Sequence, residues 1–346
     1  MADMKVAAVI ASNRQDRLKD FLDAWSPFPW SETIVIEDGP ARSFLLEGLS
    51  ATPPRHFAWA DIENDADVVD PTTFSRRDSA IKAYGFWIAV RGDADVVIAL
   101  DDDCLPVGTP ADFVADHVAA LSSRARWVPS IDGTPTRGLP YFDLGSIPGA
   151  VANMGLWRGV ADYDAPQTLA LHRAGLLHHS LNPPPGNRLI HPQNYWPWCA
   201  MNIAFRREVA PLMYMPKMGV GSPYRRFDDI WSGVILQRCC RHLGLSLAAG
   251  EPCIHHIRAS DSLVNLEKEA PGIRANEDFW KIVEATPLGT AMRTPLACAE
   301  AVGAHLADSA RDGALLARNP TLAAYLAEEG VRMSAWCAMF RGAGWI

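Results

Sequence analysis

The sequence predicts an α/β fold: a mostly parallel sheet flanked by helices, followed by a helical C-terminal extension. Two observations carry this prediction. In the first third of the chain, short apolar runs rich in Val and Ile alternate with helical segments, which is typical of a parallel sheet covered on both faces. From about residue 275 onward the sequence is Ala- and Leu-rich at helical spacing. We therefore expect a larger domain at 1–274 and a helical extension at 275–346.

The first elements follow from apolar runs and their punctuation. Residues 5–10 predict a buried strand, and Ser12 and Asn13 are suitable N-caps for a helix at 16–25. Residues 33–36 predict a second strand, which Gly39 and the following proline end. A helix at 78–90 then precedes a third strand at 95–100.

Polar side chains follow each of these three strands. Asn13 and Arg14 come after the first strand, Asp38 after the second, and an aspartate cluster after the third. Because ligands in open α/β sheets bind outside the carboxyl ends of the strands, these residues predict a nucleotide-type site at one rim of the sheet. No Gly-x-Gly-x-x-Gly and no Gly-x-x-x-x-Gly-Lys motif is present, so the dehydrogenase and P-loop classes lose their usual signatures.

The rest of the chain divides into loops and helices. Residues 130–226 are rich in Pro, Gly and Trp, which is typical of long functional loops. Residues 227–243 predict a helix, and 246–249 and 253–254 predict two short strands. We expect the extension at 275–346 to pack on the domain or to support a homo-oligomer.

Composition excludes several partners. The formal net charge is -8 and no basic block is present, so nucleic acid is a poor partner. No stretch reaches the length of apolar sequence that spans a membrane. The seven cysteines have no metal-ligand spacing, and the N-terminus lacks the features of a secretory leader, so we expect reduced thiols and a cytoplasmic location.

Three consecutive aspartates, Asp101-Asp102-Asp103, are the most informative motif. Like charges this close repel each other, by about 3 kcal/mol per pair at an effective dielectric near 20, and a divalent cation reverses that cost. In an extended segment Asp101 and Asp103 share one face and Asp102 takes the other. His255-His256 ends another apolar run, and adjacent residues point opposite ways, so at most one would join a metal site with the carboxylates.

Two further motifs leave alternatives open. Asp228 and Asp229 begin a predicted helix, where they can bind hydroxyl groups and act as acid or base, or can simply form an acidic helix N-terminus beside solvated Arg225 and Arg226. Arg137 lies in a Gly/Pro turn, where it can clamp a phosphate or form an ordinary surface turn.

An ordered set of segments carries a family resemblance. It comprises 78–80, 84–86, 101–104, 155–157, the run Asp162-Tyr163-Asp164-Ala165-Pro166, 199–205, 226–233, 259–260 and 264–266. In this order they resemble the reversibly glycosylated polypeptide family, the plant UDP-arabinopyranose mutases and their bacterial relatives (glycosyltransferase family 75). The resemblance implies a glycosyltransferase-A-like, Rossmann-like catalytic domain with a divalent metal, Mn²⁺ or Mg²⁺, and no flavin or NAD. It implies interconversion of the pyranose and furanose forms of a nucleotide-linked sugar.

The resemblance also assigns roles to residues. Arg137 falls on the arginine that becomes reversibly glycosylated in the family, and His256 is the better metal ligand of the histidine pair. Lys82 stands where plant members tend to have Arg. The expected sites are catalytic Arg137, Asp228, Asp229 and Asp102; nucleotide-binding Asn13, Arg14, Asp38, Asp78, Lys82 and Asp101; sugar-binding Asn202, Asp164 and Trp157; and metal-binding Asp101, Asp103 and His256.

Departures from the plant pattern bear on the substrate. Residues 143–146 lack the second arginine of the plant motif, Met154 replaces a histidine, and the loop 171–198 is not plant-like. The expected substrates are therefore a GDP-linked hexose or deoxyhexose of secondary metabolism, such as GDP-L-galactose or GDP-L-fucose, or UDP-L-arabinose. The alternatives are a Mn²⁺-dependent glycosyltransferase that passes the sugar to an acceptor, and a non-catalytic scaffold that binds nucleotide sugars.

Overall fold

The computed structural model describes residues 4–46, 53–122, 149–175, 186–257 and 260–346. Within these residues nine strands form one sheet in the order β3-β2-β1-β4-β8-β6-β9-β5, with β7 paired to β9. The strands are β1 (Val6–Ser12), β2 (Glu32–Glu37), β3 (Arg55–Phe57), β4 (Val96–Asp101), β5 (Cys104–Pro106), β6 (Ala150–Gly159), β7 (Arg188–Leu189), β8 (Asn202–Arg206) and β9 (Ser246–His256).

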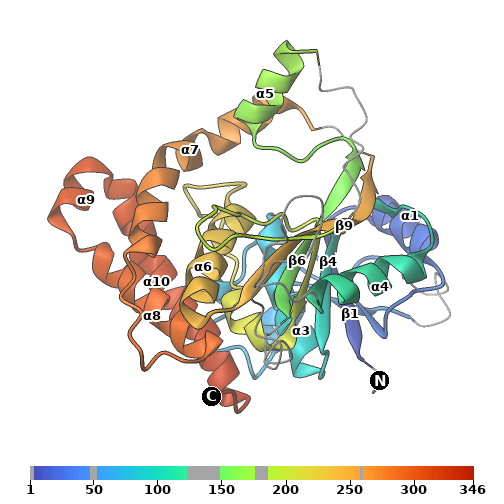
Figure 1. Ribbon diagram of the computed structural model, residues 1–346, viewed down its shortest axis with the longest axis horizontal. Coiled ribbons are helices and arrows are strands. Elements are labelled where there is room, and N and C mark those ends of the chain that lie inside the picture. The colour runs from blue at the N-terminus through green and yellow to red at the C-terminus, as the bar shows by residue number, and fades with distance from the viewer. Residues whose placement is uncertain (1–3, 47–52, 123–148, 176–185, 258–259) are drawn as a thin grey trace, which may run out of the picture.

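The direction of the strands confirms the predicted fold class. Strands β3, β2, β1 and β4 are parallel neighbours, and β6 and β9 run the same way. Only β8, β5 and β7 among the described strands run against them. The result is a mostly parallel sheet of the glycosyltransferase-A-like kind, flanked by helices and followed by a helical C-terminal region (Figure 1).

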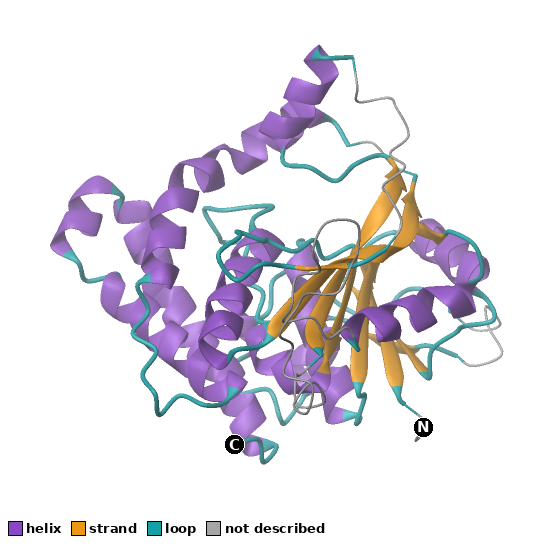
Figure 2. Cartoon of the chain, viewed as in Figure 1, coloured by secondary structure: helices purple, strands orange, loops and turns teal. Residues whose placement is uncertain are grey.

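Helices cover both faces of this sheet (Figure 2). The described helices are α1 (Gln15–Trp25), α2 (Trp59–Asn64), α3 (Lys82–Arg91), α4 (Pro110–Leu121), α5 (Ala165–Arg173), α6 (Asp228–Leu243), α7 (Ser262–Glu284), α8 (Pro295–Ser309), α9 (Gly313–Arg318) and α10 (Pro320–Gly342). Successive side chains of β1 point to opposite faces of the sheet and pack into two separate hydrophobic cores. Ala8 and Ile10 face the side of α1 and α4, whereas Ala7 and Val9 face the side of α3, α6, α8 and α10.

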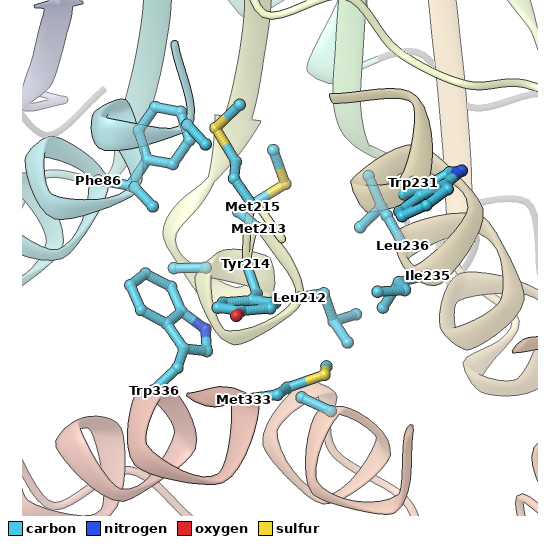
Figure 3. Close-up of a cluster of buried hydrophobic side chains, with 14 of the residues drawn as sticks. Phe86, Leu212, Met213, Tyr214, Met215, Trp231, Ile235, Leu236, Met333 and Trp336 are labelled. Carbon is cyan, nitrogen blue, oxygen red and sulfur yellow. The ribbon is translucent and has the colours of Figure 1, made fainter. Parts of the chain in front are cut away.

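The C-terminal helices belong to the same core as the sheet. In Figure 3, Met333 and Trp336 of α10 face Leu212 and Tyr214, which follow β8. The Trp336 indole donates to the Pro211 carbonyl at 2.9 Å. The buried carboxylate of Glu329 on α10 accepts the Tyr214 hydroxyl at 2.7 Å. The extension therefore packs on the sheet domain, and the expected boundary after residue 274 falls inside α7.

Several local predictions were wrong for identifiable reasons. The two short strands expected at 246–249 and 253–254 are one strand, β9, because its extra residues Glu251 and Pro252 are accommodated as a bulge against β6. Ser12 and Asn13 do not cap α1, whose N-cap is Arg14 without a side-chain hydrogen bond. The helix expected from Asp78 begins as a 3-10 turn, and α3 starts at Lys82.

The structure bears on two predictions from composition, those on the cysteines and on membrane spans. All seven cysteines are free thiols. Among the described helices, none combines the length and the apolar character that crossing a membrane requires.

The contact of α3 with the sheet gives a first prediction. A Cβ on Gly85 would lie 2.3 Å from Val9 Cγ1, so we expect Gly85→Ala to push α3 off the sheet and lower the free energy of unfolding by about 1–3 kcal/mol. Gly342→Ala is the matched control, because no atom lies within 4 Å of a Cβ built at this helical glycine. Urea denaturation measures both. Equal stability of the two variants would contradict the packing described for α3.

Candidate functional site

The carboxyl ends of β1, β2 and β4 meet two adjoining cavities. The smaller cavity, about 430 Å³, is lined by five of the predicted nucleotide-site residues: Asn13, Arg14, Asp38, Asp78 and Asp101. The larger cavity, about 520 Å³, lies between the end of β4 and helices α5, α6 and α7. A wider cavity of about 1620 Å³ opens at the opposite, amino-terminal ends of β1 and β4, away from these residues.

Basic side chains neutralise two of the three consecutive aspartates. Arg14 forms an ion pair with Asp102 through two of its nitrogens, and Ser12 is hydrogen-bonded to the same carboxylate. The buried Lys82 ammonium pairs with Asp101 and donates to the Ala200 carbonyl. Burial alone would raise the pKa of Asp101, but the charge and hydrogen bond of Lys82 outweigh it and lower that pKa.

Asp103 is the least neutralised member of the cluster. Within the described residues, its one ion pair besides the contact with His256 is with Arg14, whose Nη2 lies 3.3 Å from Oδ2. Burial, followed by the charge of Asp101, raises the pKa of Asp103. Of the three aspartates, Asp103 therefore has the least compensation of its negative charge by neighbouring cations.

His256 faces Asp103 in a geometry suited to metal binding. Its Nδ1 lies 2.9 Å from the Val160 carbonyl, which can only accept, so Nδ1 donates and Nε2 of the neutral ring carries the lone pair. Nε2 lies 3.8 Å from Asp103 Oδ1, so two acceptors face each other across a short gap. Asp103 and His256 could hold a divalent cation there. Among the described residues, no third His, Cys, Asp or Glu completes a metal cluster.

A second group of carboxylates surrounds the start of α6. Asp228 accepts the Ser79 hydroxyl at 2.6 Å, and Asp229 accepts the backbone N–H groups of Ala200 at 3.0 Å and Ile230 at 2.8 Å. Burial raises the pKa of Asp228. Burial and then the charge of Asp228 raise the pKa values of Asp78 and Asp229 well above the ordinary range. The group can therefore hold protons where ordinary carboxylates would have lost them, as acid–base catalysis requires.

The larger cavity has an aromatic wall. Trp157 packs edge-on against Tyr163 with ring centroids 6.1 Å apart, and the Trp157 indole N–H is buried without a partner in the described residues. Asp164 lines the same cavity while its carboxylate caps α5 by accepting from Gln167 N. Apolar rings beside buried carboxylates suit a ligand such as a sugar, which has both hydroxyl groups and apolar C–H faces.

Two of the predicted site residues that the structure describes line neither cavity. Lys82 lies beneath Asp101 and lines neither cavity. Asn202 is buried, and its amide donates to the Leu156 and Pro252 carbonyls, so it holds the β6–β9 bulge from below. Arg137 lies outside the described residues. Asp38 reaches the smaller cavity, but its carboxylate also accepts from the backbone of Arg77 and Asp78 and so shapes the cavity wall.

Three side chains of the larger cavity were not predicted from the sequence. Asp162 and Tyr163 were part of a recognised motif but received no role, and Glu269 carries no local signal because α7 reaches the cavity only through tertiary packing. Arg226, one of two arginines expected to be solvated, lines both cavities.

The acidic group at α6 gives a prediction about pH. Because the folded chain holds these carboxyl protons above the ordinary pKa of about 4, stability should fall as pH rises from there through the pKa values of the folded cluster. Asp228→Asn removes one buried charge and should flatten that fall. Urea midpoints at about pH 5 and about pH 8 test it, with the exposed Asp20→Asn as a control that keeps the wild-type slope. A wild-type slope in Asp228→Asn would show that the cluster ionises normally.

Comparison with known proteins identifies similar chains. A family model described as "Reversibly glycosylated polypeptide" matches residues 1–342. The chain is 31% identical over 291 residues to the probable UDP-arabinopyranose mutase 1 of Pisum sativum. The matched region covers 78% of this chain and 75% of that relative. The chain is 30% identical over 292 residues to UDP-arabinopyranose mutase 1 of Arabidopsis thaliana, with 78% and 76% covered. It is 30% identical over 283 residues to UDP-arabinopyranose mutase 1 of Oryza sativa subsp. japonica, with 75% and 72% covered.

Proposed function

The chain belongs to the reversibly glycosylated polypeptide family, and on this premise we propose that it is a nucleotide-sugar mutase. The proposed reaction interconverts the pyranose and furanose forms of a sugar linked to a nucleoside diphosphate. The observation that carries the proposal in this chain is the pair of cavities that adjoin at the end of β4, with Arg14 and Asp101 lining both. A nucleoside would occupy the smaller cavity and the sugar the larger one, with the diphosphate between them.

We propose that Asp103 and His256 hold a divalent metal, Mn²⁺ or Mg²⁺, with the remaining ligands supplied by the diphosphate. Such ions commonly bind through one or two carboxylates plus substrate phosphates, so two protein ligands are a chemically sufficient set. The two opposed acceptors at 3.8 Å and the unmet charge of Asp103 support this choice. When bound, the metal would neutralise the diphosphate and make it a better leaving group.

The side chains of the chain itself would supply positioning and proton transfer. Ring opening and closure require a proton to leave one sugar hydroxyl and reach another oxygen. Asp228 and Asp229 are suited to that exchange, because burial raises their pKa values and lets them hold protons at higher pH than ordinary carboxylates do. Trp157 and Tyr163 would exclude water from the sugar while it is open. Asp102, paired with Arg14, would act mainly by fixing that arginine.

Several nucleotide sugars are alternative substrates in this proposal. We infer a GDP-linked hexose or deoxyhexose, such as GDP-L-galactose or GDP-L-fucose, or UDP-L-arabinose. No oxidation state changes between the two ring forms, so the proposal requires neither flavin nor NAD. Arg137 stays a predicted participant that would steady the diphosphate or the sugar. A homo-oligomer and a cytoplasmic location stay predictions from the sequence.

An assay without acceptor tests the proposed function. Purified chain, Mn²⁺ and a panel of the three nucleotide sugars are incubated, and the ring form of the nucleotide sugar is followed by chromatography. Conversion of at least one into its other ring form is expected. Transfer that occurs only after an acceptor is added would favour a glycosyltransferase. Neither reaction over the panel would favour a non-catalytic scaffold.

Variants of the histidine pair test the metal site. His256→Ala removes the buried ligand and should lower turnover by about 100-fold or more while weakening Mn²⁺ binding. His255→Ala is the matched control, because this neighbour is exposed and should keep wild-type turnover. Calorimetric titration with Mn²⁺ reports the binding separately from activity. Wild-type turnover and Mn²⁺ affinity in His256→Ala would remove this residue from the proposed site.

A further inference from the structure

The two cavities share a boundary at which Arg226 stands. This residue precedes α6, and its side chain lines the smaller and the larger cavity alike. Arg14, Ser79 and Asp101 are the other residues that line both. Any ligand that extends from one cavity into the other must therefore pass these four side chains.

Arg14 and Lys82 are the cations that contact the aspartate cluster. The Arg14 guanidinium uses Nε and Nη2 on Asp102 and also contacts Asp103 through Nη2. The Lys82 ammonium is buried between Asp101 and the Ala200 carbonyl. Within the described residues Arg14 therefore keeps only Nη1 without a hydrogen bond to protein, and the Lys82 ammonium is buried with its two acceptors.

Arg226 differs because only one edge of its guanidinium is engaged. Its Nε donates to Glu269 Oε1 at 2.7 Å, whereas Nη2 makes only a long ion pair with Asp162 Oδ1, at 4.0 Å. In the part of the chain that the structure describes, neither Nη1 nor Nη2 donates a hydrogen bond to another residue. The side chain is 35% exposed, so these donors are accessible from the cavities.

Glu269 fixes the orientation of this arginine. It is buried on α7, and its second oxygen accepts from Ala165 N at the start of α5 at 2.7 Å. Gly272, one turn further along α7, lies against the Phe227 ring, where an added Cβ would come within 2.4 Å. The segment that carries Arg226 is thus held directly against α7.

The backbone at Arg226 is also in an uncommon conformation. Its φ angle is 62°, in the left-handed region that costs a residue with a Cβ roughly 1 kcal/mol or more. Residues held in this region concentrate at ligand-binding sites, where the surrounding structure enforces them. Here the enforced conformation carries a guanidinium with unused donors to the boundary of two cavities.

We propose that Arg226 binds the diphosphate of the nucleotide sugar where the two cavities meet, and that Glu269 is the positioning residue that aims it. This inference rests on the proposed function, since it takes a nucleoside diphosphate as the ligand. The planar fork of Nη1 and Nη2 matches two phosphate oxygens, while Nε remains on Glu269. A lysine at this position would keep the charge but lose the fork.

Calorimetric titration of the full chain with UDP and with GDP, each with Mn²⁺, tests the role of Arg226. For whichever diphosphate wild type binds, Arg226→Ala should weaken affinity by about 10- to 100-fold, and Arg226→Lys should lie between. Arg225→Ala is the matched control, because this arginine is exposed and lines neither cavity. Binding of the corresponding nucleoside, followed by NMR titration, should be unchanged in Arg226→Ala.

Different results would contradict the proposed function and the role of Arg226. If wild type binds neither diphosphate, the proposed function fails. If wild type binds one and Arg226→Ala binds it equally well, the role of Arg226 is overturned while the function stands. An equal loss of nucleoside affinity would show that Arg226 shapes the cavity instead of contacting phosphate. Arg226→Lys, which preserves the ion pair with Glu269, supplies the comparison if the alanine variant is unfolded.

A double-mutant cycle tests Glu269. If Glu269 acts through Arg226, Glu269→Gln should weaken diphosphate binding in the wild-type background and add nothing in the Arg226→Ala background. Its thermal stability is measured in parallel. Losses of affinity that add in the double variant would give Glu269 a role independent of Arg226 and would overturn its assignment as a positioning residue.

Discussion

Three adjacent carboxylates at the end of a buried strand must be neutralised, and the rest of the site is arranged around that constraint. Two like charges 4 Å apart repel by about 4 kcal/mol at an effective dielectric near 20. Two ion pairs offset this repulsion: Lys82 of α3 pairs with Asp101, and Arg14, which follows β1, pairs with Asp102. Because Lys82 also binds the Ala200 carbonyl, the same compensation ties the start of β8 to the rim. Asp103 is left with the least compensation and faces His256.

This uneven neutralisation divides the site into regions with different chemistry. Around Asp103, the proposed metal and diphosphate would complete the charge balance. Around the start of α6, burial raises the pKa values of Asp228 and Asp229. The mutase proposal needs both regions, because a leaving diphosphate requires positive charge and a sugar that changes its ring oxygen requires proton exchange. Asp103, His256, Asp228 and Asp229 all line the larger cavity, so a sugar bound there would lie within reach of both regions.

The sequence predicted the features that depend on local pattern. The apolar runs at β1, β2 and β4 and the helical spacing of α6 were sufficient for those elements, and the polar residues after each strand located the rim. Features that depend on contacts distant in sequence were not predictable. The ion pair between Arg226 and Glu269 joins residues 43 positions apart. Asn202 was expected to bind the sugar, but its amide donates to backbone carbonyls at the β6–β9 bulge. Ser12 has the chemistry of a helix cap, yet its hydroxyl is hydrogen-bonded to Asp102 because β4 lies beside β1.

A crystal structure of the chain with Mn²⁺ and the nucleoside diphosphate that it binds would test the central claim most directly. Anomalous scattering at the manganese edge locates the metal independently of the protein coordinates. The expected result is a manganese peak between Asp103 and His256, with the nucleoside in the smaller cavity and the phosphates at the boundary with the larger one. A nucleotide in the wide cavity at the opposite strand ends, or a metal remote from Asp103, would contradict it.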